Sequence, residues 1–288
     1  MVVVDSHQHF WDPGVLDMPS APPEAAVFNR PYLPKDLLPE LQNAGVSYTV
    51  LVQGLPQALS TNNWYFQLAA ENDFIAGVVA WIDLTQPDSL SNTLEPLQQE
   101  SKFVGIRHIL DMESDPNWIL QNQVIQSLRE LARRNIPFDL CVNPGHLDNI
   151  LELFELIPDL RVVIDHIAKP AIAENRLDNW KPAMQKISQN PNAYCKLSGM
   201  VTEADWKQWK PKDLVPYVES VVEAFGDRRL LFGSDWPVCL LAASYGELLQ
   251  ALNSVLKGLT TQQRHRIFGG TAIEFYGLRL PAISWNDS

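Results

Sequence analysis

Short apolar runs alternate along this chain with amphipathic segments, and this alternation restricts the possible folds more than any other feature. About eight such runs occur, and several, such as TVLVQG, VVAWID and RVVIDH, are almost continuously apolar. Strands of this composition are typical of parallel sheets that are covered on both faces. The predicted strands begin at Val2, Val46, Phe74, Val104, Pro137, Arg161, Ala193 and Leu230.

Segments between these runs carry the periodicity of outer helices. In the segment 117–134, apolar residues recur at helical spacing, namely Ile119, Leu120, Val124, Leu128 and Leu131. The segment 211–225 has the same character. The segment 13–34 carries several prolines and is expected to be either an irregular connection or a lid at the rim of the site.

Eight strand-helix alternations favour a closed (β/α)8 barrel, a TIM barrel, over an open doubly wound sheet. No GxGxxG or GxxxxGK[ST] loop follows any of the runs, so the usual evidence for a nucleotide-binding open sheet is missing. The 288 residues suit one barrel domain spanning 1–288. In such a barrel the active site lies at the C-terminal ends of the strands, so polar residues near the predicted strand ends are the candidate site residues.

Charge and cysteine usage limit the partners and the compartment. The formal net charge of -12 would repel phosphate backbones and acidic membrane surfaces, so neither nucleic acid nor a membrane is an expected partner. The sequence opens without a basic segment followed by an apolar stretch, and no apolar run is long enough to span a bilayer, so neither export nor a membrane span is expected. Cys141, Cys195 and Cys239 each lie in an apolar run, as expected of reduced, buried thiols in a cytoplasmic protein.

Histidines gather near the ends of the predicted strands. His7 and His9 are two apart, so a strand points both imidazoles to the same side. His166 follows one apolar run and Asp235 follows another. Three imidazoles and a carboxylate from three strands suit zinc or a similar divalent ion. The alternative is that these are ordinary polar residues at strand ends.

Cationic groups also lie near strand ends, namely Arg107, His108, Lys169 and Lys196. They would place positive charge at the mouth of an otherwise acidic protein, which suits a substrate with a carboxylate or a developing oxyanion. The alternative is that each pairs with a nearby carboxylate.

Two tryptophans and two serines stand beside the predicted ligands. Trp11 and Trp236 could shape a pocket for a sugar-like ring or could simply pack in the core. Ser198 and Ser234 lack a surrounding GxSxG elbow, so a serine nucleophile is not expected.

Several motifs together resemble the amidohydrolase-related family. They are DSHQHFWD at 5–12, GIRH at 105–108, DHIAKP at 165–170, KLSG at 196–199 and GSDWPV at 233–238. GGTAIEFYGL at 269–278 resembles the helix that closes the family's barrel. The resemblance covers nearly the whole chain in order, and it is strongest to the branch of sugar-acid lactonases.

The resemblance implies a distorted (β/α)8 barrel with a metal site. His7, His9, His166 and Asp235 stand at the positions of metal ligands, with Asp235 and His166 also catalytic. Many relatives place a carboxylated lysine where this chain has Arg107 and His108, so one divalent ion, with zinc expected, is favoured over a binuclear centre. Some lactonases of this kind are thought to work without bound metal, which leaves direct substrate binding by the same residues as an alternative.

The implied activity is hydrolysis of a lactone, with a small molecule as the partner. Water would attack the ring ester while Asp235 takes and returns the proton. Trp11, Trp236, Arg107, His108, Lys169 and Lys196 would contact the substrate. Two alternatives remain, a non-oxidative decarboxylase of the same family and a barrel that binds a metabolite without catalysis.

Overall fold

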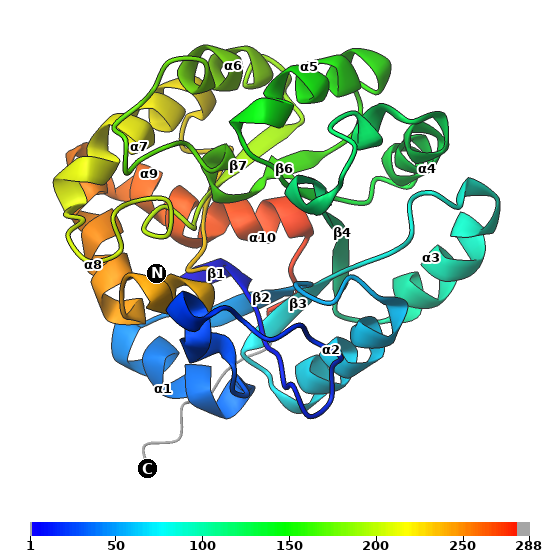
Figure 1. The fold of residues 1–288 in the computed structure, drawn as a ribbon, viewed down its shortest axis with the longest axis horizontal. Coiled ribbons are helices and arrows are strands. Elements are labelled where there is room, and N and C mark those ends of the chain that lie inside the picture. Colours follow the sequence, from blue (N-terminus) through cyan, green and yellow to red (C-terminus); the bar gives the residue numbers. More distant parts are fainter. Residues whose placement is uncertain (1, 281–288) are drawn as a thin grey trace.

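Eight parallel strands form one sheet in sequence order in the computed structural model, which describes residues 2–280 (Figure 1). The strands are β1 (Val4–Gln8), β2 (Tyr48–Val52), β3 (Ile75–Ala80), β4 (Phe103–Ile109), β5 (Phe138–Cys141), β6 (Val162–Ile164), β7 (Ala193–Leu197) and β8 (Leu230–Phe232). The ends of the sheet meet, because the Asp235 amide donates to the His7 carbonyl at 2.8 Å and the His9 amide to the Trp236 carbonyl at 2.7 Å. The predicted (β/α)8 barrel is therefore confirmed.

The predicted strand positions agree with the structure. The starts of β7 and β8 coincide with Ala193 and Leu230, while β1 and β2 begin slightly later than predicted, at Val4 and Tyr48. Nearly all strand residues are buried, as expected of strands enclosed by helices on one side and by the barrel interior on the other.

Helices surround the barrel (Figure 1). They are α1 (Pro34–Ala44), α2 (Leu59–Glu71), α3 (Leu90–Gln99), α4 (Asn122–Arg133), α5 (Leu147–Leu156), α6 (Trp180–Ile187), α7 (Pro211–Phe225), α8 (Tyr245–Val255), α9 (Thr261–His265) and α10 (Thr271–Tyr276). The predicted helix at 211–225 coincides with α7. The continuous helix predicted over 117–134 is wrong, because Gln121 is extended with ψ 140° and separates a short 3-10 turn, η4 (Trp118–Leu120), from α4.

The N-terminal end of the barrel is covered by the segment that contains the predicted closing helix. A π-helical turn, η9 (Arg266–Gly270), leads directly into α10. The Tyr276 hydroxyl donates to Asp139 Oδ2 at 2.7 Å inside the barrel, and Arg161 donates to the Phe275 carbonyl. This end is therefore closed by protein, which leaves the C-terminal ends of the strands for a ligand.

The proline-bearing segment after β1 is an anchored connection with one 3-10 helix, η1 (Pro23–Phe28). Trp11 Nε1 donates to the carbonyls of Phe28 and Arg30, each at 3.1 Å. Backbone bonds between Trp11 and Tyr32 join its two ends. These bonds hold the segment against the mouth of the barrel.

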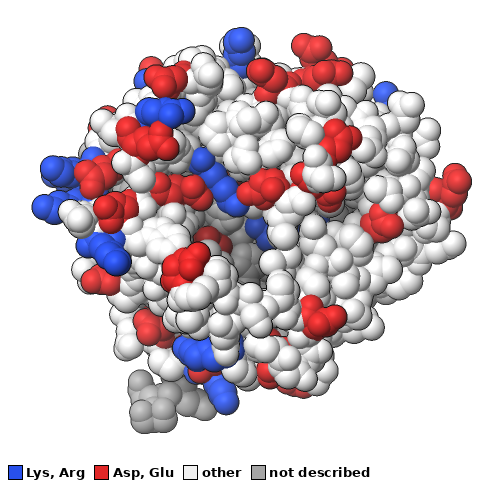
Figure 2. All heavy atoms as spheres, viewed as in Figure 1, with Lys and Arg blue, Asp and Glu red and all other residues white. Residues whose placement is uncertain are grey.

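The cysteines and the charged side chains lie where the sequence predicts, with the cysteines inside and the charges spread over the surface. All three cysteines are buried free thiols. Acidic and basic side chains are interspersed over the face in Figure 2, without a large patch of one sign. None of the helices in residues 2–280 is both long and apolar enough to cross a bilayer.

Candidate active site

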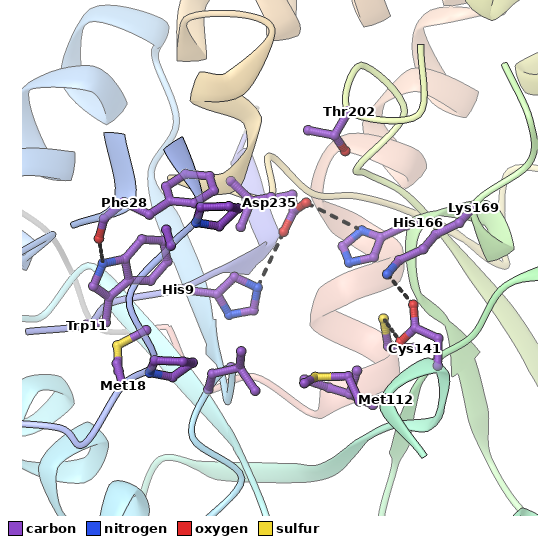
Figure 3. A pocket seen from close by; sticks show the side chains of 18 of the residues that line it. His9, Trp11, Met18, Phe28, Met112, Cys141, His166, Lys169, Thr202 and Asp235 are labelled. Carbon is purple, nitrogen blue, oxygen red and sulfur yellow. Dashed lines mark hydrogen bonds and ion pairs between the residues drawn. The ribbon is translucent and has the colours of Figure 1, made fainter. Parts of the chain in front are cut away.

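A cavity of about 740 Å³ opens at the C-terminal ends of the strands, where Figure 2 shows the face hollowed. Its polar lining comes largely from the C-terminal ends of five strands, β1, β4, β6, β7 and β8, and includes His9, Arg107, Asp111, His166, Lys169, Thr202, Glu203 and Asp235. Its apolar wall includes Trp11, Met18, Phe28 and Met112 (Figure 3). The segment 13–34, which follows β1, supplies much of this wall and so shapes the cavity, as a rim segment was expected to do.

His7 and His9 point to one side of the end of β1, as their spacing predicts. The His9 Nδ1 lies 2.7 Å from the Val52 carbonyl, which can only accept, so Nδ1 carries a proton, and in the neutral imidazole the lone pair is on Nε2. That Nε2 lies 3.1 Å from His7 Nε2. Two ring nitrogens so close, aimed at the same place, need a proton or a cation between them.

His166 is presented by an unusual backbone. Four consecutive residues, His166, Ile167, Ala168 and Lys169, have positive φ between 47° and 60° and form one left-handed turn. Left-handed conformations cost roughly 1–2 kcal/mol per non-glycine residue, and such strain gathers at functional sites. The turn is held by Trp180 Nε1, which donates to the Ile167 carbonyl at 2.7 Å. It directs His166 and Lys169 into the same cavity.

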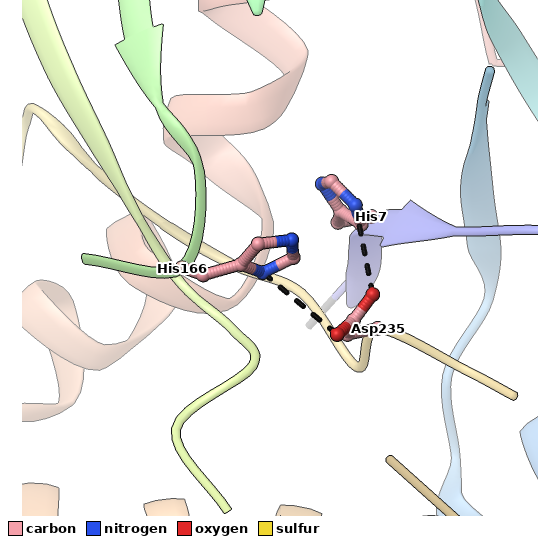
Figure 4. Close-up of side chains that lie close together, drawn as sticks. All are labelled: His7, His166 and Asp235. Atoms are coloured by element: carbon pink, nitrogen blue, oxygen red, sulfur yellow. Dashed lines mark ion pairs between the residues drawn. The ribbon is translucent and has the colours of Figure 1, made fainter. Parts of the chain in front are cut away.

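Asp235 lies at the centre of the histidines (Figure 4). Its carboxylate oxygens are 3.7 Å from His7 Nε2, 3.4 Å from His9 Nε2 and 3.9 Å from His166 Nδ1. Burial by itself raises the pKa of this carboxyl, but the histidines, His166 foremost, hold the pKa below its ordinary value. Burial lowers the pKa of His166 to about 4. Asp235 is therefore ionised and His166 neutral near pH 7.

Two glycines allow the imidazoles to approach the neighbouring strands. A Cβ atom on Gly199 would lie 2.6 Å from His166 Nδ1, and one on Gly233 would lie 2.7 Å from the Cβ of His7. Gly199 also has φ of +62°, which glycine adopts without strain. Neither position has room for a side chain without displacing a site histidine.

The donor set fits a divalent cation. One ligand atom each from His7, His166 and Asp235 lie within 4.8 Å of one another. The neutral imidazoles and the ionised carboxylate have the protonation states that a metal requires. The available lone pair of His9 Nε2, directed toward Asp235, supplies a fourth candidate. All four predicted ligands are thus brought together.

Lys196 lies below this group in a buried ionic layer, which we define as Arg107, Asp139, Asp165 and Lys196, and of which Arg107 also borders the cavity. Lys196 Nζ contacts Asp139 at 2.5 Å and Asp165 at 3.0 Å. Arg107 Nε donates to Asp165 at 3.0 Å. The layer contains two charges of each sign, so its own charges balance. Lys196 does not line the cavity among the residues that the structure describes.

The ionic layer reaches the predicted metal site through His7. His7 Nδ1 lies 3.0 Å from Lys196 Nζ and 3.2 Å from Asp165 Oδ1. Burial, and then the charge of Lys196, lower the pKa of His7 well below its usual value. Because the Lys196 ammonium can only donate, His7 Nδ1 accepts from it and Nε2 carries the proton on the side of Asp235. Metal ligation by Nε2 would require Nδ1 to donate to Asp165 Oδ1 instead.

The other predicted cations are also paired. Lys169 lines the cavity and contacts Asp111 Oδ2 at 2.5 Å (Figure 3). Arg107 lines it too, although its Nε is taken by Asp165 and its Nη1 donates to the Gln53 carbonyl at 2.7 Å. The alternative of local salt bridges therefore describes both side chains, while both still face the cavity.

His108 and Trp236 point away from the cavity, whereas Trp11 lines it. His108 stacks on Trp118 with ring centroids 3.9 Å apart and lies 2.8 Å from Glu113. Trp236 is 2% exposed and packs edge to face against Phe10 and Tyr32. The packing alternative describes Trp236.

Sequence reasoning missed four carboxylates near the site, namely Asp111, Asp139, Asp165 and Glu203. Asp165 directly precedes His166, and Asp139 interrupts the apolar run FDLC, so both could have been singled out as charges inside predicted strands. Asp111 lies in the loop after β4 and Glu203 in the loop after β7, where no local pattern distinguishes them. Only the closing of the barrel brings them together.

Comparison with known proteins places the chain among enzymes of this architecture. The L-fucono-1,5-lactonase of Burkholderia ambifaria is 37% identical over 286 residues and is matched over 97% of both chains. The enzyme of the same name from Burkholderia multivorans is 33% identical, with 97% of both chains matched. A zinc-bound amidohydrolase crystal structure from Burkholderia multivorans has a TM-score of 0.89 at 31% identity, covering 97% of this chain and 100% of that chain.

The match extends to the family as a whole. The profile of the amidohydrolase family matches residues 4–278, which include every strand and α10. The resemblance of the sequence motifs is thereby confirmed, and the chain belongs to the amidohydrolase family.

Proposed function

We propose that this protein is a lactonase that opens the ring ester of an uncharged sugar-acid lactone with the help of one divalent metal ion, zinc being the first candidate. The observation that carries the proposal is the Asp235 carboxyl group within 3.9 Å of three imidazoles, in a cavity whose cations already have carboxylate partners. The two relatives named as lactonases, matched along almost their full length, support the same reaction.

The charge of the cavity favours a neutral substrate over a carboxylic acid. Arg107 is paired with Asp165 and Lys169 with Asp111, while Asp111, Glu203 and Asp235 all line the cavity. With those two pairs neutral, Glu203 and Asp235 remain without a lysine or arginine partner, so a substrate carboxylate would approach two like charges and would compete for cations that are already engaged. This argues against the decarboxylase alternative, whose substrate is an acid, and against the expectation of a substrate carboxylate at a cationic mouth.

The residues suggest a division of labour in the hydrolysis. Asp235 accepts a proton from the attacking water and returns it to the leaving ring oxygen. His166 and the pair of β1 histidines position the water beside Asp235 and would hold the cation there. Arg107 directs a remaining N–H toward the ester carbonyl, where it stabilises the oxyanion. A bound divalent ion would add Lewis-acid polarisation of the carbonyl and a lower pKa of the water.

The apolar wall completes the cavity. Trp11 is fixed through its indole N–H, so its ring presents a rigid face. Met18 and Phe28 extend this surface. A ring with one apolar flank and several hydroxyls would use both sides of such a cavity.

We also infer one domain over 1–288 and a cytoplasmic location. The family profile covers the barrel from β1 to beyond α10, which supports one domain. Three buried thiols without a disulfide suit a reducing compartment.

The test is proton release from a panel of five- and six-membered sugar lactones in weak buffer with a pH indicator, with metal analysis of the same preparation. We expect lactones to be opened faster than amides or phosphate esters, with about one equivalent of metal or less. Carbon dioxide release from an aromatic or unsaturated acid, without lactone opening, would establish the decarboxylase instead.

A further inference from the structure

Glu203 is a cavity carboxylate for which the reaction outlined above has no use. It lies in the loop after β7, is half-buried and lines the cavity with Thr202. Within residues 2–280, no hydrogen bond or ion pair engages its carboxylate, whereas the Thr202 hydroxyl already donates to the Gly199 carbonyl at 2.7 Å. Its two oxygens therefore have free lone pairs facing the cavity, which water satisfies until a ligand with donors takes its place.

The backbone holds Glu203 in a defined place. Its carbonyl accepts a hydrogen bond at 2.9 Å from the amide of Ala173, in the loop after β6, and the next residue, Ala204, is buried. The loops after β6 and β7 are thus tied together at this point. The side chain therefore faces the cavity from a fixed base.

The charges around Glu203 show which groups it can serve. Burial raises its pKa, Lys169 lowers it, and Asp235 and Asp111 raise it again, so the carboxylate lies within electrostatic range of the reacting centre and of the Lys169–Asp111 pair. Lys169 is already engaged by Asp111 at 2.5 Å. Glu203 is therefore available to accept hydrogen bonds from uncharged donor groups of a ligand, whereas an anionic ligand would be repelled.

We propose that Glu203 selects the substrate by accepting hydrogen bonds from ring hydroxyls of the lactone while the ring ester lies at Asp235. This inference rests on the proposed function and adds a specificity residue to it. A carboxylate accepts from two hydroxyls at once, and hydrogen bonds to a charged group are the stronger kind. Glu203 favours hydroxylated, uncharged rings and rejects acids.

The experiment compares two matched pairs of small molecules on the wild-type protein, Glu203→Ala, Glu203→Gln and the control Glu174→Gln. Glu174 lies in the loop after β6 with 61% of its side chain exposed, so the control removes the same charge outside the cavity. The first pair, for turnover, is glucono-1,5-lactone and δ-valerolactone, which lacks the hydroxyls. The second pair, for calorimetric binding, is the corresponding sugar lactam and 2-piperidone, whose ring amides replace the ester.

We expect Glu203→Ala to raise KM for gluconolactone and to weaken lactam binding by about 10- to 100-fold, with kcat changed only a few-fold. δ-Valerolactone and 2-piperidone should be unaffected, Glu203→Gln should lie between, and the control should match wild type. Equal losses for both members of a pair, or no loss, would overturn the role of Glu203. Failure of the wild type to open either lactone would contradict the proposed function, while lactam binding would still decide the role of Glu203.

Discussion

Two groups of charged side chains lie inside this barrel, and they differ in how completely they are paired. In the ionic layer, Lys196 has two carboxylate partners and Asp165 has two cationic ones, all fully buried or nearly so. In the cavity above, Asp235 meets only imidazoles and Glu203 has no partner among the described residues. The first group is closed and neutral, and the second is open and acidic.

The paired group stabilises the structure, and the unpaired group is available for binding and catalysis. Paired charges that are removed from water hold side chains in one geometry, and losing one partner leaves the other uncompensated. Groups left unpaired in a cavity have free lone pairs for a cation, a water or a substrate. His7 joins the two groups, since its Nδ1 faces the ionic layer and its Nε2 faces Asp235. Substitutions in the cavity should therefore affect turnover or metal binding, and substitutions in the ionic layer should affect stability.

The largest effect is expected in the open group, from Asp235→Asn. The amide keeps the shape but cannot accept the proton, so kcat should fall by roughly 10²- to 10⁴-fold. Asparagine also tolerates the positive φ of 57° at this position, so the fold should persist. Turnover and thermal melting are measured on the same samples. Near-normal turnover in a folded variant would remove Asp235 from the proton transfer.

In the ionic layer, Lys196→Met should act mainly on stability. It would leave Asp139 without its cation and Asp165 with Arg107 alone, at a cost of about 3–5 kcal/mol in the free energy of unfolding. Urea denaturation measures this loss. The control is Lys181→Met, which removes a partly exposed lysine 3.8 Å from Glu223 and should cost about 1 kcal/mol or less. Equal losses in the two variants would show that the buried layer contributes no more than a surface pair.

A smaller effect is expected from His9→Ala, which removes a cavity-facing imidazole. Loss of one candidate ligand should weaken metal binding by at least about 10-fold without unfolding the barrel. Metal content after dialysis against a weak chelator, together with thermal melting, measures both quantities. The control is His265→Ala, which removes an exposed imidazole of α9. If His9→Ala retains as much metal as the control, His9 is not a ligand.

The smallest effect on turnover is expected from Tyr276→Phe at the closed end of the barrel. The hydroxyl donates to Asp139, which keeps Lys196 as a partner, so the cost should be about 1–3 kcal/mol with turnover almost unchanged. Urea denaturation and turnover are compared. A fall in turnover of tenfold or more at unchanged stability would mean that the ionic layer controls the site, and the distinction between the two groups would fail.

Much of the fold and of the candidate site could be predicted from the sequence. Strand periodicity alone places His7 and His9 on one side of β1. The same rule separates Arg107 from His108, because neighbours in a strand face opposite sides, and the structure has Arg107 lining the cavity and His108 stacked on Trp118. Applying the alternation to β4 would have removed His108 from the predicted substrate contacts.

Depth in the barrel could not be predicted in this way. Lys196 and Lys169 both lie near the end of an apolar run, yet Lys196 is fully buried beside Asp139 while Lys169 faces the cavity from a left-handed turn. Their different positions depend on the length of each strand and on the backbone after it. Local sequence patterns report which face a residue takes but not its height along the barrel.

The sequence by itself determined the alternation of strands and helices, the family motifs and the residue types at the strand ends, because these depend on period and composition over short stretches. The tertiary structure alone decided which charges became partners. The Asp5 carboxylate accepts a hydrogen bond at 2.8 Å from the amide of Ser234, 229 residues away in sequence. Lys196 Nζ lies 3.0 Å from His7 Nδ1, 189 residues away. Such contacts form only when β8 closes against β1, since barrel closure brings distant strand ends to one point and removes their side chains from water together.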